Sequence, residues 1–158
     1  MSVDAFLKME LKGESVADGH KGEIEVLSWS WGMSQTGTTH RGTGGGAGKV
    51  NVQDISITKY VDSASPGLTL ACCNGKHFDE IVLTVRKAGE KPLDYLIYTF
   101  NDVIISSVST GGSSGSDLVT ENVSFNFAKF KKSYQPQDNK GGKAGGAIEV
   151  QYSIAENK

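Results

Sequence analysis

The stretch VSFNFA, residues 123–128, decides the fold class because large apolar and small or polar side chains alternate along it without interruption. Successive side chains of an extended strand point to opposite faces, so the valine and the two phenylalanines share one face. The same period of two recurs in three further segments, 3–11, 81–86 and 148–154. This pattern predicts antiparallel strands that each bury one face.

Two other segments depart from simple alternation. In 50–59 the apolar positions shift by one residue near Gln53 and Asp54, which predicts a β-bulge that bends the strand. In 95–105 both faces are apolar. One face fills the core, and we expect a second copy of the chain to cover the other. The side chains expected on that second face, as subunit-interface candidates, are Tyr95, Ile97, Val103 and Ile105.

One helix is expected, over residues 66–74. Ser63 or Ser65 can cap its N-terminus. Pro66 suits the first turn, and Gly75 can end the helix. Most of the 20 glycines lie in three clusters, which predicts long loops between rigid elements. The clusters span 42–48, 111–115 and 141–146.

The expected fold is therefore all-β, a β-barrel of antiparallel strands with one short α-helix and long Gly-rich loops. The chain has 158 residues, which fits a single domain over 1–158.

The composition argues against several classes of protein. Sixteen Lys and Arg residues against 18 Asp and Glu residues give a net charge of −2, which is a poor match for nucleic-acid binding. No apolar run is long enough for a membrane span, and the N-terminus lacks the basic and apolar regions of a secretory signal. Cys72 and Cys73 are expected to be reduced thiols.

Three motifs look chemical but lack the context that their chemistry needs. Ser113, in 111–115, matches a hydrolase nucleophile pattern, yet a strand-like segment follows and no histidine lies downstream. The glycine-rich stretch 42–49 precedes a strand, whereas a phosphate-binding loop precedes a helix. The histidines at 20, 40 and 77 lack the spacing of metal ligands and are expected at the surface. We therefore expect no catalytic, cofactor-binding or metal site, and no enzyme.

Residues 27–33, LSWSWGM, carry one large apolar face and one small polar face. The large face has to be buried. Ser28 and Ser30 lie on the small face, which fits a smooth polar wall and an ordinary solvent-exposed surface equally well. Trp29 and Trp31 leave an alternative open, a small carbohydrate- or ligand-binding β-barrel in which the indole rings stack on a sugar.

Nearly the whole chain, in order, resembles the haemolysin-coregulated protein (Hcp) family, the inner-tube proteins of bacterial type VI secretion systems. The runs around 29–31 and 50–66 are the most specific part of that resemblance. The matching stretches are FLKMELKGES (6–15), HKGEIEVLSWSWGMSQ (20–35), GGGAGKVNVQDISITKYVDSASPGL (44–68), GKHFDEIVLTVRKAGE (75–90), VIISSVSTGGSSG (103–115) and ENVSFNFAKFKKSYQPQ (121–137).

This resemblance implies a homohexamer, in which six copies of a β-barrel with a short helix close into a ring around a channel. The rings would stack into a tube that works with a spike protein trimer, a contractile sheath and a baseplate. Small effector proteins would travel in the channel. The chain would be made in the bacterial cytoplasm and exported by the secretion system, without any cofactor, nucleic acid or membrane span.

The resemblance also gives roles to particular residues. Ser28 and Ser30 would face the channel and contact effectors. The loop 36–48 would reach toward a neighbouring subunit or ring. The candidates for that contact are Thr39, His40, Arg41, Gly44, Gly45 and Gly46.

Overall fold

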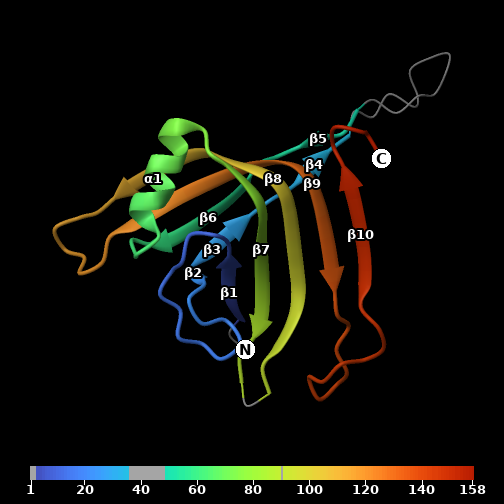
Figure 1. The fold of residues 1–158 in the computed structure, drawn as a ribbon. Helices are drawn as coiled ribbons and strands as arrows, with labels where there is room; N and C mark the ends of the chain where they lie inside the picture. The colour runs from blue at the N-terminus through green and yellow to red at the C-terminus, as the bar shows by residue number, and fades with distance from the viewer. Residues whose placement is uncertain (1–2, 36–48, 90) are drawn as a thin grey trace.

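In a computed structural model of the chain, which describes residues 3–35, 49–89 and 91–158, antiparallel strands make up most of the fold and one helix flanks them (Figure 1). The strands are β1 (Val3–Lys8), β2 (Ile24–Val26), β3 (Ser28–Ser30), β4 (Met33–Ser34), β5 (Asn51–Val52), β6 (Ile55–Tyr60), β7 (His77–Lys87), β8 (Leu93–Gly111), β9 (Thr120–Tyr134) and β10 (Ile148–Ser153), and the helix is α1 (Ser65–Asn74).

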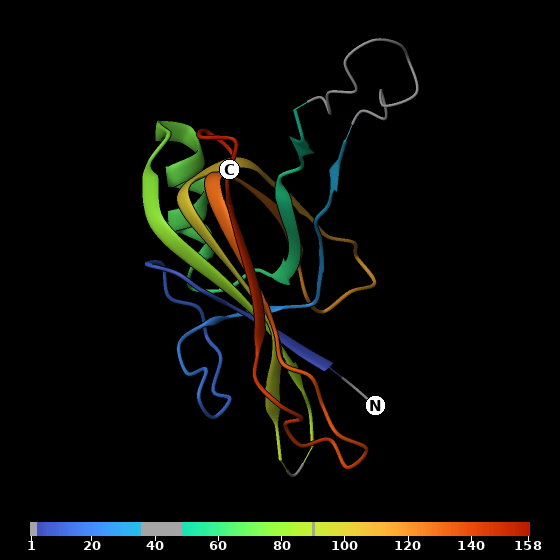
Figure 2. The ribbon, with the colours of Figure 1, turned by 90° about the vertical axis from the view of Figure 1, so that its right-hand side faces the viewer.

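The main sheet curls so far round that its two end strands, β2 and β3, are consecutive in the chain. The strand order is β2-β1-β7-β8-β9-β6-β3. β10 pairs with residues 129–134 of β9, beyond the stretch of β9 that pairs with β6. Only Leu27 separates β2 from β3, so residues 24–30 pair with β1 through one half and with β6 through the other. The sheet is therefore nearly closed (Figure 2), and the predicted all-β barrel with one short helix is confirmed.

The three longest neighbouring strands, β7, β8 and β9, all change their buried face at the same level. In each strand two fully or nearly buried side chains lie three residues apart, where simple alternation would place them on opposite faces. The pairs are Phe78 and Ile81, Phe100 and Val103, and Phe127 and Phe130. The ladders keep their register through this level, so the three strands bend together. Asp102, at the bend of β8, has φ +55°.

This bend overturns part of the interface prediction. Val103 is 0% exposed and Ile105 is 4% exposed, and both lie in the core of the single chain. The prediction of an outer position is wrong because it carried one alternation through Asp102, where the strand turns its other face inward. Tyr95 and Ile97 precede the bend and are half-buried.

The helix begins and ends close to the predicted bounds, but its N-terminus is built differently. It spans Ser65–Asn74, and Gly75 ends it with φ +68°, as expected from a residue without a Cβ atom. Neither Ser63 nor Ser65 caps it, because Ala64 occupies the cap position without a side-chain hydrogen bond. Asp62 Oδ1 instead accepts from the Ala64 N–H at 3.0 Å. The half-buried Cys72 and the exposed Cys73 are both free thiols.

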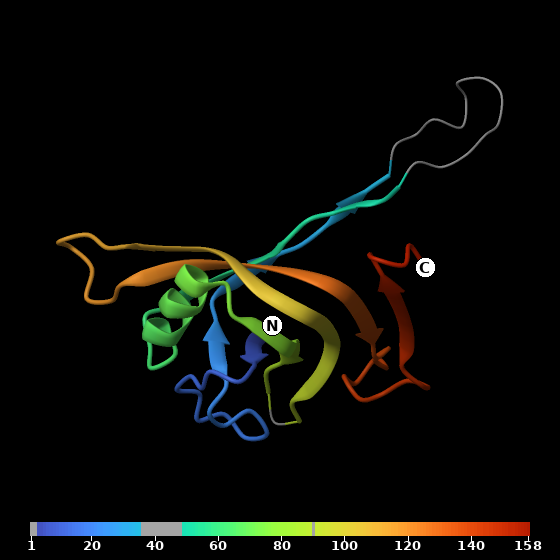
Figure 3. The same cartoon turned by 45° about the horizontal axis from the view of Figure 1, so that its top comes forward.

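The chain interrupts its strand at Gln53 and Asp54, where the apolar phase shifts. The interruption is larger than the predicted bulge, because β5 leaves the main sheet and pairs with β4 instead. The β4–β5 ribbon projects away from the barrel (Figure 3). Met33, on this ribbon, is consequently exposed. Leu27, between β2 and β3, is exposed as well, although the alternation of 27–33 predicted that both would be buried. No helix in the described part of the chain is long and apolar enough to cross a bilayer.

Candidate functional site

A row of small polar side chains crosses four neighbouring strands on the side that faces away from the core. The register aligns Ser28, Thr58, Asn122 and Ser109 in one line across β3, β6, β9 and β8. A second line consists of Ser30, Ser56, Ser124 and Ser107. Directly opposed residues share a face, so these eight uncharged side chains form one surface, which we call the hydroxyl face.

The hydroxyl face exists because the same strands alternate with the core. Ile55 and Ile57 are buried on β6, and Ser56 and Thr58 lie between and beyond them on the opposite side. Trp29, between the two predicted serines of β3, packs against the core. The structure therefore places Ser28 and Ser30 side by side with six further hydroxyl and amide residues that the alternation had not grouped with them.

Several side chains of this surface bond to each other across the strands. The Ser56 and Ser124 hydroxyls lie 2.8 Å apart, and the Thr58 hydroxyl donates to Asn122 Oδ1 at 2.6 Å. Beside the hydroxyl face, Asp54 directly precedes β6 and accepts from the Ser106 hydroxyl at 2.6 Å and from the Asn126 amide at 2.9 Å. These bonds satisfy polar groups within the plane of the sheet and leave a surface of low charge.

Both edges of the four-stranded region are open in the part of the chain that the structure describes. The ladder between β1 and β2 stops at Val26, so β3 pairs with β6 alone. At the other edge, β8 pairs with β7 only as far as Ile104, and Ser107–Gly111 pairs with β9 alone. Open strand edges expose unpaired backbone groups that a further strand can bond.

The tryptophans are half-buried and pack against aromatic side chains of the core. The Trp31 ring packs edge-on against Tyr98, Phe100 and Phe130, with ring centroids 4.9 to 5.3 Å apart. Its indole N–H donates to the Gln53 carbonyl at 2.9 Å. Sugar-binding tryptophans expose a ring face for stacking, and the packing of Trp31 does not favour that use.

A buried ion cluster lies where β6, β9 and the helix meet, and the sequence analysis missed it. Lys59 and Glu121 are cross-strand partners and form an ion pair. The Lys59 ammonium also lies 2.9 Å from Asp62 Oδ1 and donates to the Ser65 hydroxyl at 3.0 Å. Lys59 lies two residues after the buried Ile57, and Glu121 lies two residues before the buried Val123. Both charged side chains therefore point to the core side of the sheet. Two opposite charges on the buried phase of two paired strands were the signal that could have revealed the cluster.

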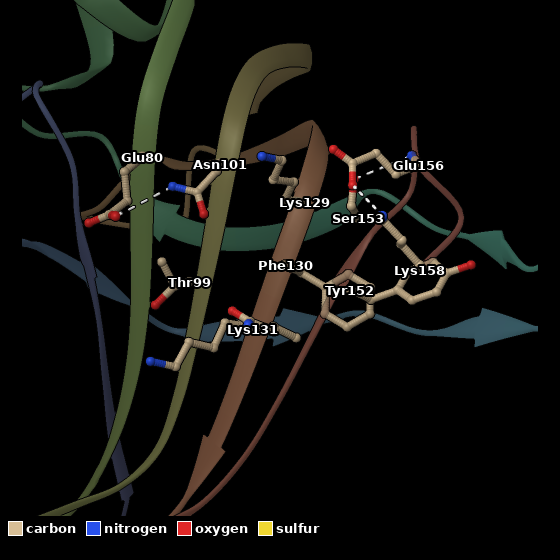
Figure 4. Close-up of a pocket in the computed structure, with 11 residues that line it drawn as sticks. Glu80, Thr99, Asn101, Lys129, Phe130, Lys131, Tyr152, Ser153, Glu156 and Lys158 are labelled. Atoms are coloured by element: carbon tan, nitrogen blue, oxygen red, sulfur yellow. Dashed lines mark hydrogen bonds and ion pairs between the residues drawn. The ribbon is translucent and has the colours of Figure 1, made fainter.

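An open hollow of about 520 Å³ lies over the bend of β7, β8 and β9 beside β10 (Figure 4). Its side chains are mixed in charge, and several bond to one another rather than converging on one point. The Asn101 amide donates to Glu80 at 3.4 Å, and Lys158 pairs with Glu156 at 3.9 Å. Such an arrangement is typical of a solvated surface.

The other predicted site residues fall in separate places. The loop residues Thr39, His40, Arg41, Gly44, Gly45 and Gly46 lie outside the described residues. Ser113 lies exposed in the β8–β9 connection. In the described ranges no three His, Cys, Asp or Glu side chains gather as metal ligands.

Known proteins resemble this chain over nearly its whole length. Residues 6–134 match a family described as "Type VI secretion system effector, Hcp". A relative named Protein hcp1, from Pseudomonas aeruginosa, is 54% identical over 159 residues, covering 99% of this chain and 98% of that protein. The chain belongs to the Hcp family.

Solved structures of similar proteins share this fold. The structure of Hcp1 from Salmonella typhimurium superposes with a TM-score of 0.83 and 42% identity, covering 100% of this chain and 99% of that one. A structure described as a type six secretion system protein superposes with a TM-score of 0.93 and 33% identity, covering 99% of each chain. As a member of the Hcp family, the chain is a tube protein of type VI secretion.

Proposed function

We propose that this Hcp-family chain is a subunit of a hexameric ring whose hydroxyl face lines a central channel. The observation that carries the proposal is the four-stranded region with one uncharged polar face and two open edges. Further copies of the chain could complete this region by pairing with both open edges.

The two edges differ in sequence and position, so their contact would be heterologous. The β3 edge of one copy would lie beside the Ser107–Gly111 edge of β8 in the next copy. Heterologous contacts generate a ring when the rotation between copies closes. Tyr95 and Ile97, both half-buried, remain further candidates for covering by a neighbour.

The chemistry of the hydroxyl face suits a channel wall. Small side chains that bond to each other in the plane of the sheet offer few fixed charges or large apolar groups to a passing protein. We therefore propose that small effector proteins travel along this face and contact Ser28 and Ser30. We also propose that rings stack through the loop that contains Thr39, His40, Arg41, Gly44, Gly45 and Gly46.

Membership of the family supports the remaining roles that we propose. We propose that the stacked rings work with a spike trimer, a contractile sheath and a baseplate, and that the chain is made in the bacterial cytoplasm and exported by that system. The protein would act as a structural subunit rather than as an enzyme. Ser113, the one hydrolase-like serine, lies in an exposed loop.

Light scattering on a sizing column tests the ring, and we expect a mass near six times 16.8 kDa. The proposed edge contact has a sharper test. Within one copy, Ser28 and Ser109 lie at opposite ends of one line across four strands, about 14 Å apart at the usual strand spacing. A bismaleimide linker shorter than about 10 Å could therefore join cysteines at these positions only between copies.

The cross-linking variant is Ser28→Cys with Ser109→Cys in a Cys72→Ser, Cys73→Ser background. We expect a ladder of covalent species that ends at six chains. Each single-cysteine variant is the matched control and should give no species beyond a dimer. A monomeric mass at every concentration would contradict the ring, whereas a hexameric mass without a ladder would contradict only the edge contact.

A further inference from the structure

A small second cluster of buried side chains lies on the outer face of β1 and β7, beneath the segment that joins β1 to β2. Phe6 is 4% exposed but lies apart from the main core. Its ring stacks on His20, with centroids 4.5 Å apart and planes 3° from parallel. The Arg86 guanidinium lies 5.0 Å from the centroid of Phe6. The segment that carries His20 therefore closes over this face of the sheet.

His20 is 7% exposed, so the expectation that it is a surface histidine is wrong. Each of its ring nitrogens faces a carboxylate. Nδ1 lies 2.9 Å from Glu23 Oε1, and Nε2 lies 3.1 and 3.2 Å from the two carboxylate oxygens of Asp94. Glu23 belongs to the same segment as His20, whereas Asp94 lies at the start of β8. The imidazole thus links the segment to the β7–β8 hairpin.

The two contacts require two donors. An ionised carboxylate only accepts hydrogen bonds, whereas a neutral imidazole has one N–H and a protonated imidazolium has two. The geometry around His20 therefore fits the imidazolium. Loss of the proton would leave one of the two carboxylates facing a nitrogen lone pair, and the link to that carboxylate would be lost.

The other charged groups of the cluster leave this conclusion unchanged. Arg86, on β7, donates to the Asp18 carbonyl at 2.8 Å and lies 3.9 Å from Asp4 on β1. Its positive charge is thus directed to the segment's backbone and to another carboxylate. Glu23 and Asp94 remain the groups that face the imidazole nitrogens.

We propose that His20 is a pH-operated clasp that holds the segment 11–23 on the β7–β8 hairpin. The clasp is closed while the imidazole carries its second proton and opens when that proton leaves. The sign follows from the bonding: the closed state binds the proton, so closure is favoured at low pH and weakens as the pH rises.

Amide hydrogen exchange followed by mass spectrometry on the intact protein tests the clasp. The segment has internal backbone bonds, from Gly13 N–H to the Gly22 carbonyl at 2.9 Å and from Ser15 N–H to the Glu23 carbonyl at 3.0 Å. We expect their protection to depend on the segment being held on the hairpin. After correction for the intrinsic pH dependence of exchange, we expect protection to fall by up to about tenfold per pH unit as one proton is lost.

Two variants separate the clasp from other causes of a pH effect. His20→Gln should give lower protection of the segment that no longer changes with pH. His77→Gln removes an exposed histidine and is the matched control, which should behave as the wild type. Asp94→Asn changes a carboxylate whose side chain is 40% exposed, so it should fold and show a smaller pH dependence.

Equal corrected protection of the segment at about pH 5 and about pH 8 in the wild-type protein would overturn the proposal. An unchanged pH dependence in Asp94→Asn would overturn it as well, even if His20→Gln failed to fold. The proposal does not depend on ring formation.

Discussion

At the scale of single residues, the least expected feature is a lysine with no exposed surface. Lys59 is 0% exposed and Glu121 is 2% exposed. Removing two charges from water costs several kcal/mol each, and only close partners offset that cost. The Lys59 ammonium has three of them, in Glu121, Asp62 and Ser65. These contacts connect β6, β9 and the first turn of the helix, so the cluster positions the helix N-terminus that has no side-chain cap.

Replacing the lysine alone should be strongly destabilising. Lys59→Met leaves the Glu121 carboxylate buried without its cation, and the expected loss in unfolding free energy is about 3–5 kcal/mol. Urea unfolding at a fixed protein concentration measures it. Lys76→Met breaks an exposed pair with Glu10 and should cost at most about 1 kcal/mol. Equal losses in the two variants would show that the buried pair contributes no more to the unfolding free energy than the exposed pair does.

The double variant Lys59→Met, Glu121→Leu gives a further check on that cluster. Replacing both members of a buried pair by apolar residues removes the uncompensated charge, so much of the lost stability should return. A double variant as unstable as Lys59→Met would indicate that packing, not charge, explains the loss.

At the scale of elements, the clasped segment depends on one close approach of two backbone strands. A Cβ atom on Gly13 would lie 2.7 Å from the Glu23 carbonyl oxygen and 2.7 Å from Ile24 Cα. Both obstacles are backbone atoms, which cannot rotate away as a flexible side chain could. Residue 13 therefore has to be glycine for β2 to reach its place beside β1.

Gly13→Ala should therefore lower the unfolding free energy by about 1–3 kcal/mol, the usual cost of overpacking. Gly115→Ala is the matched control, because no heavy atom lies within 4 Å of its added Cβ. Thermal unfolding of the two variants under one set of conditions makes the comparison. A Gly13→Ala protein as stable as Gly115→Ala would show that the segment moves aside at no cost.

The same scale shows what the sequence could and could not predict. Alternation identified the strands because each buries every second side chain, and Pro66 and Gly75 marked the helix. It misplaced Val103 and Ile105 because a bend shared by three strands leaves no mark in the pattern of one strand. It missed Lys59 with Glu121, and His20 with Asp94, because a charge is buried only when a distant partner makes burial tolerable. Ser28 and Ser30 were identified, but the six residues beside them required the register.

At the scale of the whole molecule, the proposed ring contact joins two edges without charged side chains. Ser28–Ser30 and Ser107–Gly111 carry none, so the contact would consist of backbone bonds and packing. We therefore expect the mass of the ring to be unchanged in roughly 1 M salt, where the Debye length is about 3 Å. Light scattering across a salt series measures it, and dissociation at high salt would assign the contact to ion pairs elsewhere.

The length of two paired strands has a mechanical consequence. β8 has 19 residues and β9 has 15, and they remain paired from Leu96 to Gly111 through the bend. The bonds of an antiparallel ladder run perpendicular to the strands, so a pull along the strands loads many of them in parallel as shear. A pull across the strands would load the hydrogen bonds one at a time, so they would break in sequence. The barrel is therefore far stiffer along β8 and β9 than across them, and a force transmitted along that direction would meet its strongest axis.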